Sequence, residues 1–178
     1  MTIRAKGLLA ACVLGIALFS GAASAADAPA APARPVADYA VVNLHIDVDK
    51  PMDIVWKKVG GYCDISAWLK VGCSYTSGSG DVGTVRRLTI ARLPNGIDEV
   101  MVGKTAHSYT YTQPNTTILY HGTLQVVANG KGKSKLLYNL IWDQAALTSD
   151  DAKTKDRDGR TKNFTTALET MKSIAEAP

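Results

Sequence analysis

The sequence predicts an α+β domain in which a curved antiparallel sheet of about six to seven strands wraps around one long C-terminal helix. Three observations support this prediction. One strand pattern comes first, two short helical patterns follow it, and a run of strand patterns then ends in an amphipathic helix. A sheet that curves over a single helix encloses volume. Where side chains do not fill that volume, it becomes a ligand cavity.

The first elements are a strand and two short helices. Over residues 40–48 apolar and polar residues alternate, which is typical of a half-buried strand. Asp49 as a cap residue and Pro51 in the first turn predict the start of a helix. The apolar face of that helix has the spacing i, i+3, i+4 and i+7: Met52, Val55, Trp56 and Val59. Residues 62–69 predict a second short helix.

Six further strand patterns follow, with turn residues between them. They occupy residues 73–77, 83–92, 97–103, 108–113, 117–128 and 135–144. Asn95-Gly96 and Asn129-Gly130 each separate two such runs, and an Asn-Gly pair in this position predicts a hairpin turn. The strands are therefore expected to form an antiparallel meander.

The last element is the predicted long helix. Its apolar face consists of residues at helical spacing: Phe164, Ala167, Leu168, Met171 and Ala175. The preceding stretch at 150–159 is strongly charged, and it is predicted to be a solvated loop or a frayed first turn.

The N-terminus has the pattern of a cleavable secretory signal peptide. Arg4 and Lys6 precede a short apolar run, and Ala23-Ser24-Ala25 supplies small residues for cleavage. The sequence therefore predicts a signal peptide at 1–25, an Ala/Pro-rich linker at 26–38, a folded domain at 39–178, and export to the periplasm. Cys12 lies in a lipobox-like context, but most of the apolar run follows it, so no stable membrane anchor is expected.

The charge, the cysteines and the absence of known motifs limit which classes of function are expected. Removal of residues 1–25 leaves 18 basic against 16 acidic residues, and the basic residues form no stripe, so nucleic-acid binding is not expected. In an oxidising periplasm Cys63 and Cys73 can form a disulfide, although two buried thiols fit the spacing equally well. The three histidines lack a metal-site spacing, and neither a nucleophile elbow nor a phosphate loop is present. No metal and no cofactor are predicted.

Strand parity predicts an inward-facing polar pair. Arg86 shares one face of its strand with Leu88 and Ile90, and Glu99 shares a face with Met101. If the two strands are neighbours, Arg86 and Glu99 come together. Such a pair can orient the polar end of a ligand, or it can be a structural salt bridge. Aromatic residues at period-two positions are candidates for the cavity wall or for core packing: Tyr109, Tyr111, Tyr120, Tyr138 and Trp142.

Several motifs resemble one known superfamily. They are VWKKVGGY at 55–62, Trp68, GTVRRLTI at 83–90, Glu99, SYTY at 108–111, YHGTL at 120–124 and LETMK at 168–172. Their order is similar to that of the polyketide cyclase/dehydratase and lipid-transport group of the START-like, birch-pollen-allergen-like (SRPBCC) superfamily.

This resemblance implies a helix-grip fold with a hydrophobic or amphipathic small molecule between the sheet and the C-terminal helix. Phe164 and Leu168 of that helix are then candidate ligand contacts. Trp68 is expected to pack in the core, with a position at the cavity mouth as the alternative. Leu93-Pro94 resembles part of the gate loop of plant hormone receptors in the superfamily. Their ligand-anchoring lysine has no match here, so their ligand is not implied.

Three functions are compatible with these observations. The first is a periplasmic binding or carrier protein without enzymatic activity. The second is a cyclase or dehydratase that uses Glu99 as general base and Arg86 or a tyrosine to stabilise an enolate. A neighbouring arginine makes Glu99 a weaker base, which disfavours this mechanism. The third is an accessory protein of a periplasmic dehydrogenase, because some exported members of the group serve methanol oxidation.

Overall fold

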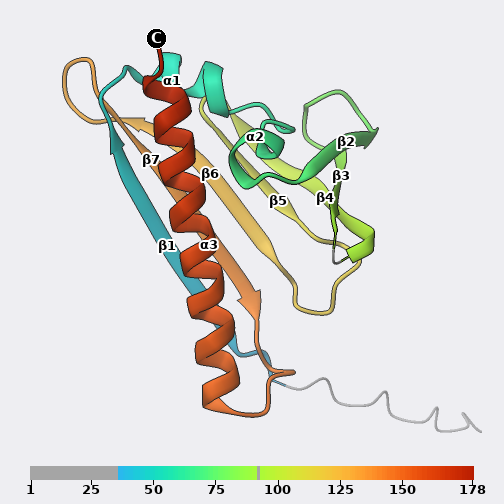
Figure 1. Ribbon diagram of the computed structural model, residues 1–178. Helices are drawn as coiled ribbons and strands as arrows, with labels where there is room; N and C mark the ends of the chain where they lie inside the picture. Colours follow the sequence, from blue (N-terminus) through green and yellow to red (C-terminus); the bar gives the residue numbers. More distant parts are fainter. Residues whose placement is uncertain (1–35, 92) are drawn as a thin grey trace, which may run out of the picture. The chain divides into compact units, whose positions relative to one another are not determined.

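Seven antiparallel strands form one sheet in the order β1-β7-β6-β5-β4-β3-β2. The computed structural model describes residues 36–91 and 93–178 (Figure 1). Its elements, in chain order, are β1 Tyr39–Val48, α1 Met52–Val59, α2 Ile65–Leu69, β2 Gly72–Ser77, β3 Val85–Ile90, β4 Leu93–Thr105, β5 Ser108–Thr112, β6 His121–Ala128, β7 Ser134–Asp143 and α3 Asp150–Glu176. The predicted fold class is confirmed. The predicted signal peptide and most of the predicted linker lie outside the described residues.

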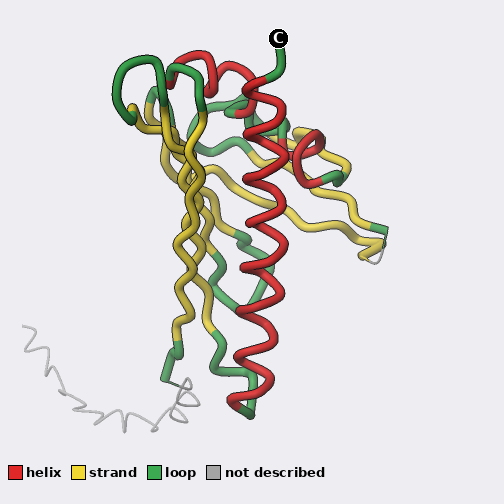
Figure 2. The backbone as a smooth tube through the Cα atoms, turned by 60° about the vertical axis from the view of Figure 1, so that its left-hand side comes forward, coloured by secondary structure: helices red, strands yellow, loops and turns green. Residues whose placement is uncertain are grey.

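The sheet bends around α3. The helix packs on β1 and β7 and on both short helices. Figures 1 and 2 show that β3 and β4 diverge from α3, with α2 near the opening between them. Because side chains alternate between the two faces of each strand, the sheet has one buried face. This face carries half of the core residues: Ala40, Val42, Leu88, Met101, Tyr109, Tyr111, Leu124, Val126, Leu136, Tyr138, Leu140 and Trp142.

Helix α3 is longer than predicted. Its buried face contains all five predicted residues, from Phe164 to Ala175. The stretch 150–159, however, is helical and is neither a loop nor a frayed turn. The Ser149 hydroxyl caps the helix by accepting a hydrogen bond from the Ala152 N–H. Two aspartates in the first turn stabilise the helix further, because their negative charges lie at the positive end of its dipole.

The sequence predicts the turn between β3 and β4 at Asn95-Gly96, and this prediction is wrong. Ile90 pairs with Leu93, and Leu88 pairs with Ile97, so the Asn-Gly pair lies inside β4 as part of an irregularity. Gly96 has a φ of +66°, and a Cβ atom there would lie 2.6 Å from the Leu88 carbonyl oxygen. The pair therefore bends a strand, whereas the predicted Asn129-Gly130 does lie between β6 and β7.

Three smaller predictions are also wrong. Residues 117–120 are not part of a strand, because β6 begins at His121 and Leu119 has a φ of +49°. Asp49 does not cap α1; the N-cap position is Pro51, and the Asp49 carboxylate instead pairs with Lys133 at 2.8 Å. The second helix begins at Ile65, three residues later than predicted.

A disulfide joins the α1–α2 connection to β2. The Cys63 and Cys73 sulfur atoms are bonded, and the two Cα atoms are 5.5 Å apart. The bond attaches the segment before α2 to the edge strand of the sheet. Among the helices of the described residues, none is both long and apolar enough to cross a membrane.

Candidate functional site

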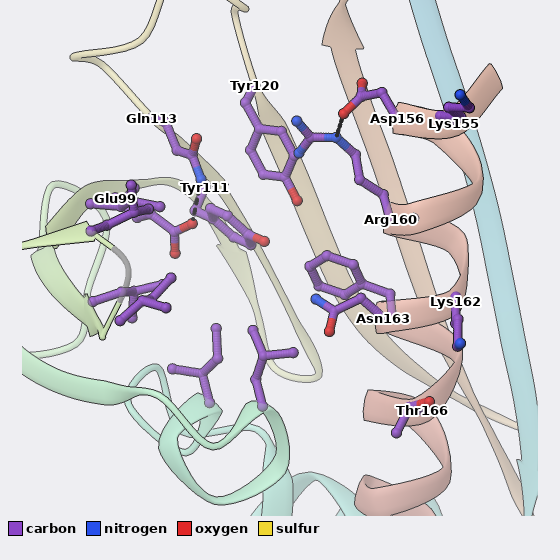
Figure 3. A pocket seen from close by; sticks show the side chains of 18 residues that line it. Glu99, Tyr111, Gln113, Tyr120, Lys155, Asp156, Arg160, Lys162, Asn163 and Thr166 are labelled. Atoms are coloured by element: carbon purple, nitrogen blue, oxygen red, sulfur yellow. Dashed lines mark hydrogen bonds and ion pairs between the residues drawn. The ribbon is translucent and has the colours of Figure 1, made fainter. Parts of the chain in front are cut away.

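A cavity of about 700 Å³ opens where α3 and the β3–β4 hairpin diverge. This volume lies within the range of small-molecule sites. Figure 3 shows the side chains around it. One wall comes from the sheet and α2, and the opposite wall comes from the N-terminal half of α3.

The wall from the sheet and α2 is mostly aliphatic. Its apolar side chains come from three elements: Ile65, Leu69, Leu88, Ile90, Leu93 and Ile97. Leu93 and Ile97 lie four residues apart in β4, and both contribute to this wall. This wall can cover the apolar part of a ligand, at about 25 cal/mol per Å² of apolar surface removed from water.

The wall from α3 is polar. It is formed by Lys155, Asp156, Gly159, Arg160, Lys162, Asn163, Phe164 and Thr166. Asp156 is held from the sheet side, because its Oδ2 accepts from Trp142 Nε1 at 2.6 Å and from Gln144 Nε2 at 3.1 Å. Its Oδ1 accepts from Arg160 Nε at 3.1 Å. The two walls thus differ in polarity across one cavity.

The predicted pairing of Arg86 and Glu99 is present in the fold. They are register partners on β3 and β4, and Arg86 Nη2 lies 2.6 Å from Glu99 Oε2. Arg86 is fully buried, also donates to the Tyr62 carbonyl, and has its guanidinium carbon 4.1 Å from the centre of the Tyr62 ring. Gln113 Nε2 donates to Glu99 Oε1 at 2.9 Å. Both carboxylate oxygens of Glu99 therefore have protein partners.

Two tyrosines add hydroxyl groups to the cavity. Tyr111 on β5 hydrogen-bonds to the Tyr138 hydroxyl at 2.9 Å. Burial raises the pKa values of Tyr111 and Tyr120 above the ordinary value of 10.0, so both hydroxyls stay protonated. Figure 3 shows that the polar ends of Glu99, Tyr111, Tyr120 and Asn163 point toward the middle of the cavity.

The predicted site residues divide into two groups. Those that line the cavity are Leu88, Ile90, Glu99, Tyr111, Tyr120 and Phe164. Those that are buried in the core and do not line it are Trp68, Arg86, Met101, Tyr109, Tyr138, Trp142 and Leu168. Trp68 does not lie at the cavity mouth; it is 2% exposed, and its ring packs edge-on against Tyr138. The core aromatics fill part of the volume between sheet and helix, and the cavity is displaced toward β3 and β4.

Sequence reasoning missed the α3 wall. Asp156, Arg160, Asn163 and Ala167 follow one another at intervals of four, three and four residues. This is the spacing of one helix face, and it could have predicted the polar wall. The charge density of 150–159 concealed it, because a charged run suggests a solvated loop. Gln113 was also missed, although it continues the period-two positions of Tyr109 and Tyr111 in the predicted strand 108–113, and this parity was a usable signal.

In the described residues, no three His, Cys, Asp or Glu side chains lie together in a group that could hold a metal ion. His107 Nε2 lies 2.6 Å from Asp53 Oδ1, on the side of α1. His45 is exposed, and His121 Nδ1 contacts the Leu119 carbonyl oxygen. None of the three histidines lines the cavity.

Solved structures share this fold. The Zhui aromatase/cyclase from Streptomyces sp. R1128 matches with a TM-score of 0.64 and 17% identity, over 78% of this chain and 94% of that one. A truncated norcoclaurine synthase from Thalictrum flavum matches with a TM-score of 0.61 and 14% identity, over 80% and 96%. An uncharacterised protein from Bacillus thuringiensis matches with a TM-score of 0.62 and 17% identity, over 78% and 100%.

These similarities show that the chain has the helix-grip fold of polyketide cyclase-like proteins. At such low identities they establish the fold alone. No protein-family model matches the sequence, and no curated protein matches it.

Proposed function

We propose that this helix-grip chain is an exported binding or carrier protein of the SRPBCC superfamily that holds an amphipathic small molecule between its sheet and α3. The observation that carries the proposal is the cavity of about 700 Å³ with one aliphatic and one polar wall. A ligand with an apolar body and a polar end matches both walls at once. Burial of its apolar surface drives binding, and the polar groups fix its orientation.

The cyclase alternative receives less support from the geometry. A general base must accept a proton from the substrate, yet Arg86 and Gln113 already occupy both oxygens of Glu99. Arg86 itself is fully buried and does not line the cavity, so it cannot touch an enolate without a rearrangement. We therefore assign Arg86 and Glu99 a structural role at the floor of the cavity. Turnover of a polyketone by the wild-type protein that is lost in a Glu99→Gln variant shown to be folded would restore the enzymatic interpretation.

Native mass spectrometry of the protein purified from the periplasm of its own host tests this proposal. The expected species starts at Ala26, lacks two hydrogens because of the disulfide, and carries a small molecule that gentle activation releases. Extraction of the sample should then return an amphipathic compound. A preparation that remains ligand-free and takes up no added amphiphile would contradict the carrier function. An intact mass that includes residues 1–25 would contradict cleavage.

A further inference from the structure

The polar wall of the cavity contains a fixed guanidinium that has unused hydrogen-bond donors. Arg160 Nε donates to Asp156 Oδ1 at 3.1 Å. Among the residues that the structure describes, neither Nη group of Arg160 has a hydrogen-bond partner. Four N–H donors of the guanidinium therefore remain available at the cavity.

The surroundings of Arg160 hold this guanidinium in place. Its central carbon lies 4.7 Å from the centre of the Trp142 ring and 5.3 Å from the centre of the Tyr120 ring. Both aromatic residues are almost fully buried. The Asp156 carboxylate is fixed in turn by Trp142 and Gln144. A planar cation held by two ring faces and one carboxylate loses little freedom when it binds an anion.

The charge balance of the cavity favours an anion. Its acidic residues, Glu99 and Asp156, are each already paired with an arginine. Lys155 and Lys162 on α3 add two further positive charges to the lining. Asn163, one turn after Arg160, points its amide into the cavity (Figure 3). The lining thus holds three cationic and two anionic side chains, so a ligand anion placed at Arg160 would meet a net positive charge and neutral donors.

We propose that the ligand is an amphipathic carboxylate, with its carboxylate bound by the two Nη groups of Arg160 and its aliphatic part against the wall of Leu88, Ile90 and Ile97. This inference rests on the proposed function and names the chemical class of the ligand. Arg160 is the specificity-determining residue, because a carboxylate accepts two parallel N–H donors from a guanidinium and an alcohol of the same length does not.

Calorimetric titration with decanoate and decanol at neutral pH tests the class of ligand. The two probes share their aliphatic chain and differ in the anionic group. For the wild-type protein we expect decanoate to bind at least about tenfold more tightly than decanol. For Arg160→Gln we expect the two affinities to agree within about twofold, with decanol affinity retained. Arg157→Gln is the matched control, since Arg157 is an exposed residue of the same helix outside this cavity, and the preference for decanoate should persist.

The outcomes separate the two proposals. Equal affinities of the wild-type protein for decanoate and decanol would overturn the carboxylate inference and leave the carrier function standing. A preference for decanoate that survives in a folded Arg160→Gln variant would also overturn it. Absence of binding for both probes in the wild-type protein would contradict the carrier function itself for aliphatic ligands. A thermal melt of each variant confirms that loss of binding is not loss of folding.

Discussion

At the scale of single residues, the Arg86–Glu99 pair shows how a charge is tolerated in this core. The guanidinium is fully buried, yet it contacts a carboxylate, a carbonyl oxygen and the faces of aromatic rings. Removal of one partner leaves the other charge buried without compensation, which is far more costly than removal of both charges.

We expect Arg86→Met to lower the free energy of unfolding by about 3–5 kcal/mol. The double variant Arg86→Met/Glu99→Gln should be more stable than this single variant, because the amide oxygen at position 99 still accepts from Gln113 without a buried charge. Urea denaturation of the three proteins measures both effects. A single variant as stable as the wild-type protein would show that the pair is not a structural anchor.

Gly122 makes room for a side chain of the cavity. It is the register partner of Tyr111, and a Cβ atom at position 122 would lie 2.4 Å from the Tyr111 ring carbon that bears the hydroxyl. The absence of a side chain lets Tyr111 lie across β6 and reach Tyr138.

Gly122→Ala is therefore expected to displace Tyr111 and to destabilise the protein by about 1–3 kcal/mol through overpacking. Gly103→Ala is the matched control, because the nearest atom to its new Cβ lies 3.8 Å away. Thermal unfolding of both variants gives the comparison. Equal melting temperatures for the two variants would contradict the packing argument.

At the scale of elements, the disulfide stabilises the segment that supplies one cavity wall. α2 is only five residues long, so its position depends on tertiary contacts and on the bond between Cys63 and Cys73. Ile65 and Leu69 of α2 both line the cavity. The disulfide therefore links stability to the shape of the site.

Cys63→Ser/Cys73→Ser should lower the free energy of unfolding by about 2–3 kcal/mol, the loop-closure value for a span of ten residues. Because α2 becomes less fixed, decanol affinity should fall as well. Urea denaturation and calorimetry measure the two effects. Unchanged affinity in the variant would show that the cavity wall is independent of the disulfide.

The elements also show what sequence patterns could predict. Alternation predicted β1 and the inner faces of β3 and β4, because one buried sheet face imposes a period of two. The same reasoning misplaced the β3–β4 turn, since Asn-Gly supplies positive φ in a strand irregularity as well as in a hairpin. It also missed the start of α3. A Ser149 cap and the partly buried hydrogen bonds of Asp156 stabilise this part of the helix, although its many charges resemble those of a solvated loop.

At the scale of the whole molecule, the cavity was predicted and its position was not. Parity identifies which side chains point inward, but it cannot tell which of them pack against one another. Trp142 and Tyr138 point inward and fill the core, whereas Leu88 and Tyr111 reach the remaining space. That division depends on the divergence of α3 from β3 and β4, which is a property of the assembled fold.

Surface carboxylates determine how stability depends on pH. A hydrogen bond from Arg87 lowers the pKa of Asp98, and the backbone N–H groups of Asp38 and Ala145 lower the pKa of Asp143, in both cases below 3.8. A lowered pKa in the folded state adds stability that is present above the unfolded value and is lost as pH falls through the folded value.

We therefore expect the urea midpoint to be nearly constant from about pH 8 to about pH 5 and to fall below about pH 4. Asp143→Asn should reduce the acid dependence, because the amide cannot titrate. Urea titrations over this pH range measure both. A midpoint that rises as the pH falls below 4 would contradict the assignment of these pairs.

The most direct test of the central claim fills the cavity with a larger side chain on β4. Ile97 lines the cavity, whereas Val102 on the same strand is exposed at 46%. A tryptophan at position 97 fills the space that the ligand needs, and a tryptophan at position 102 does not. Calorimetric titration of Ile97→Trp and Val102→Trp with decanol, after both are shown to be folded, is the measurement. The account predicts that Ile97→Trp loses binding and Val102→Trp keeps the wild-type affinity; binding that survives in Ile97→Trp would contradict it.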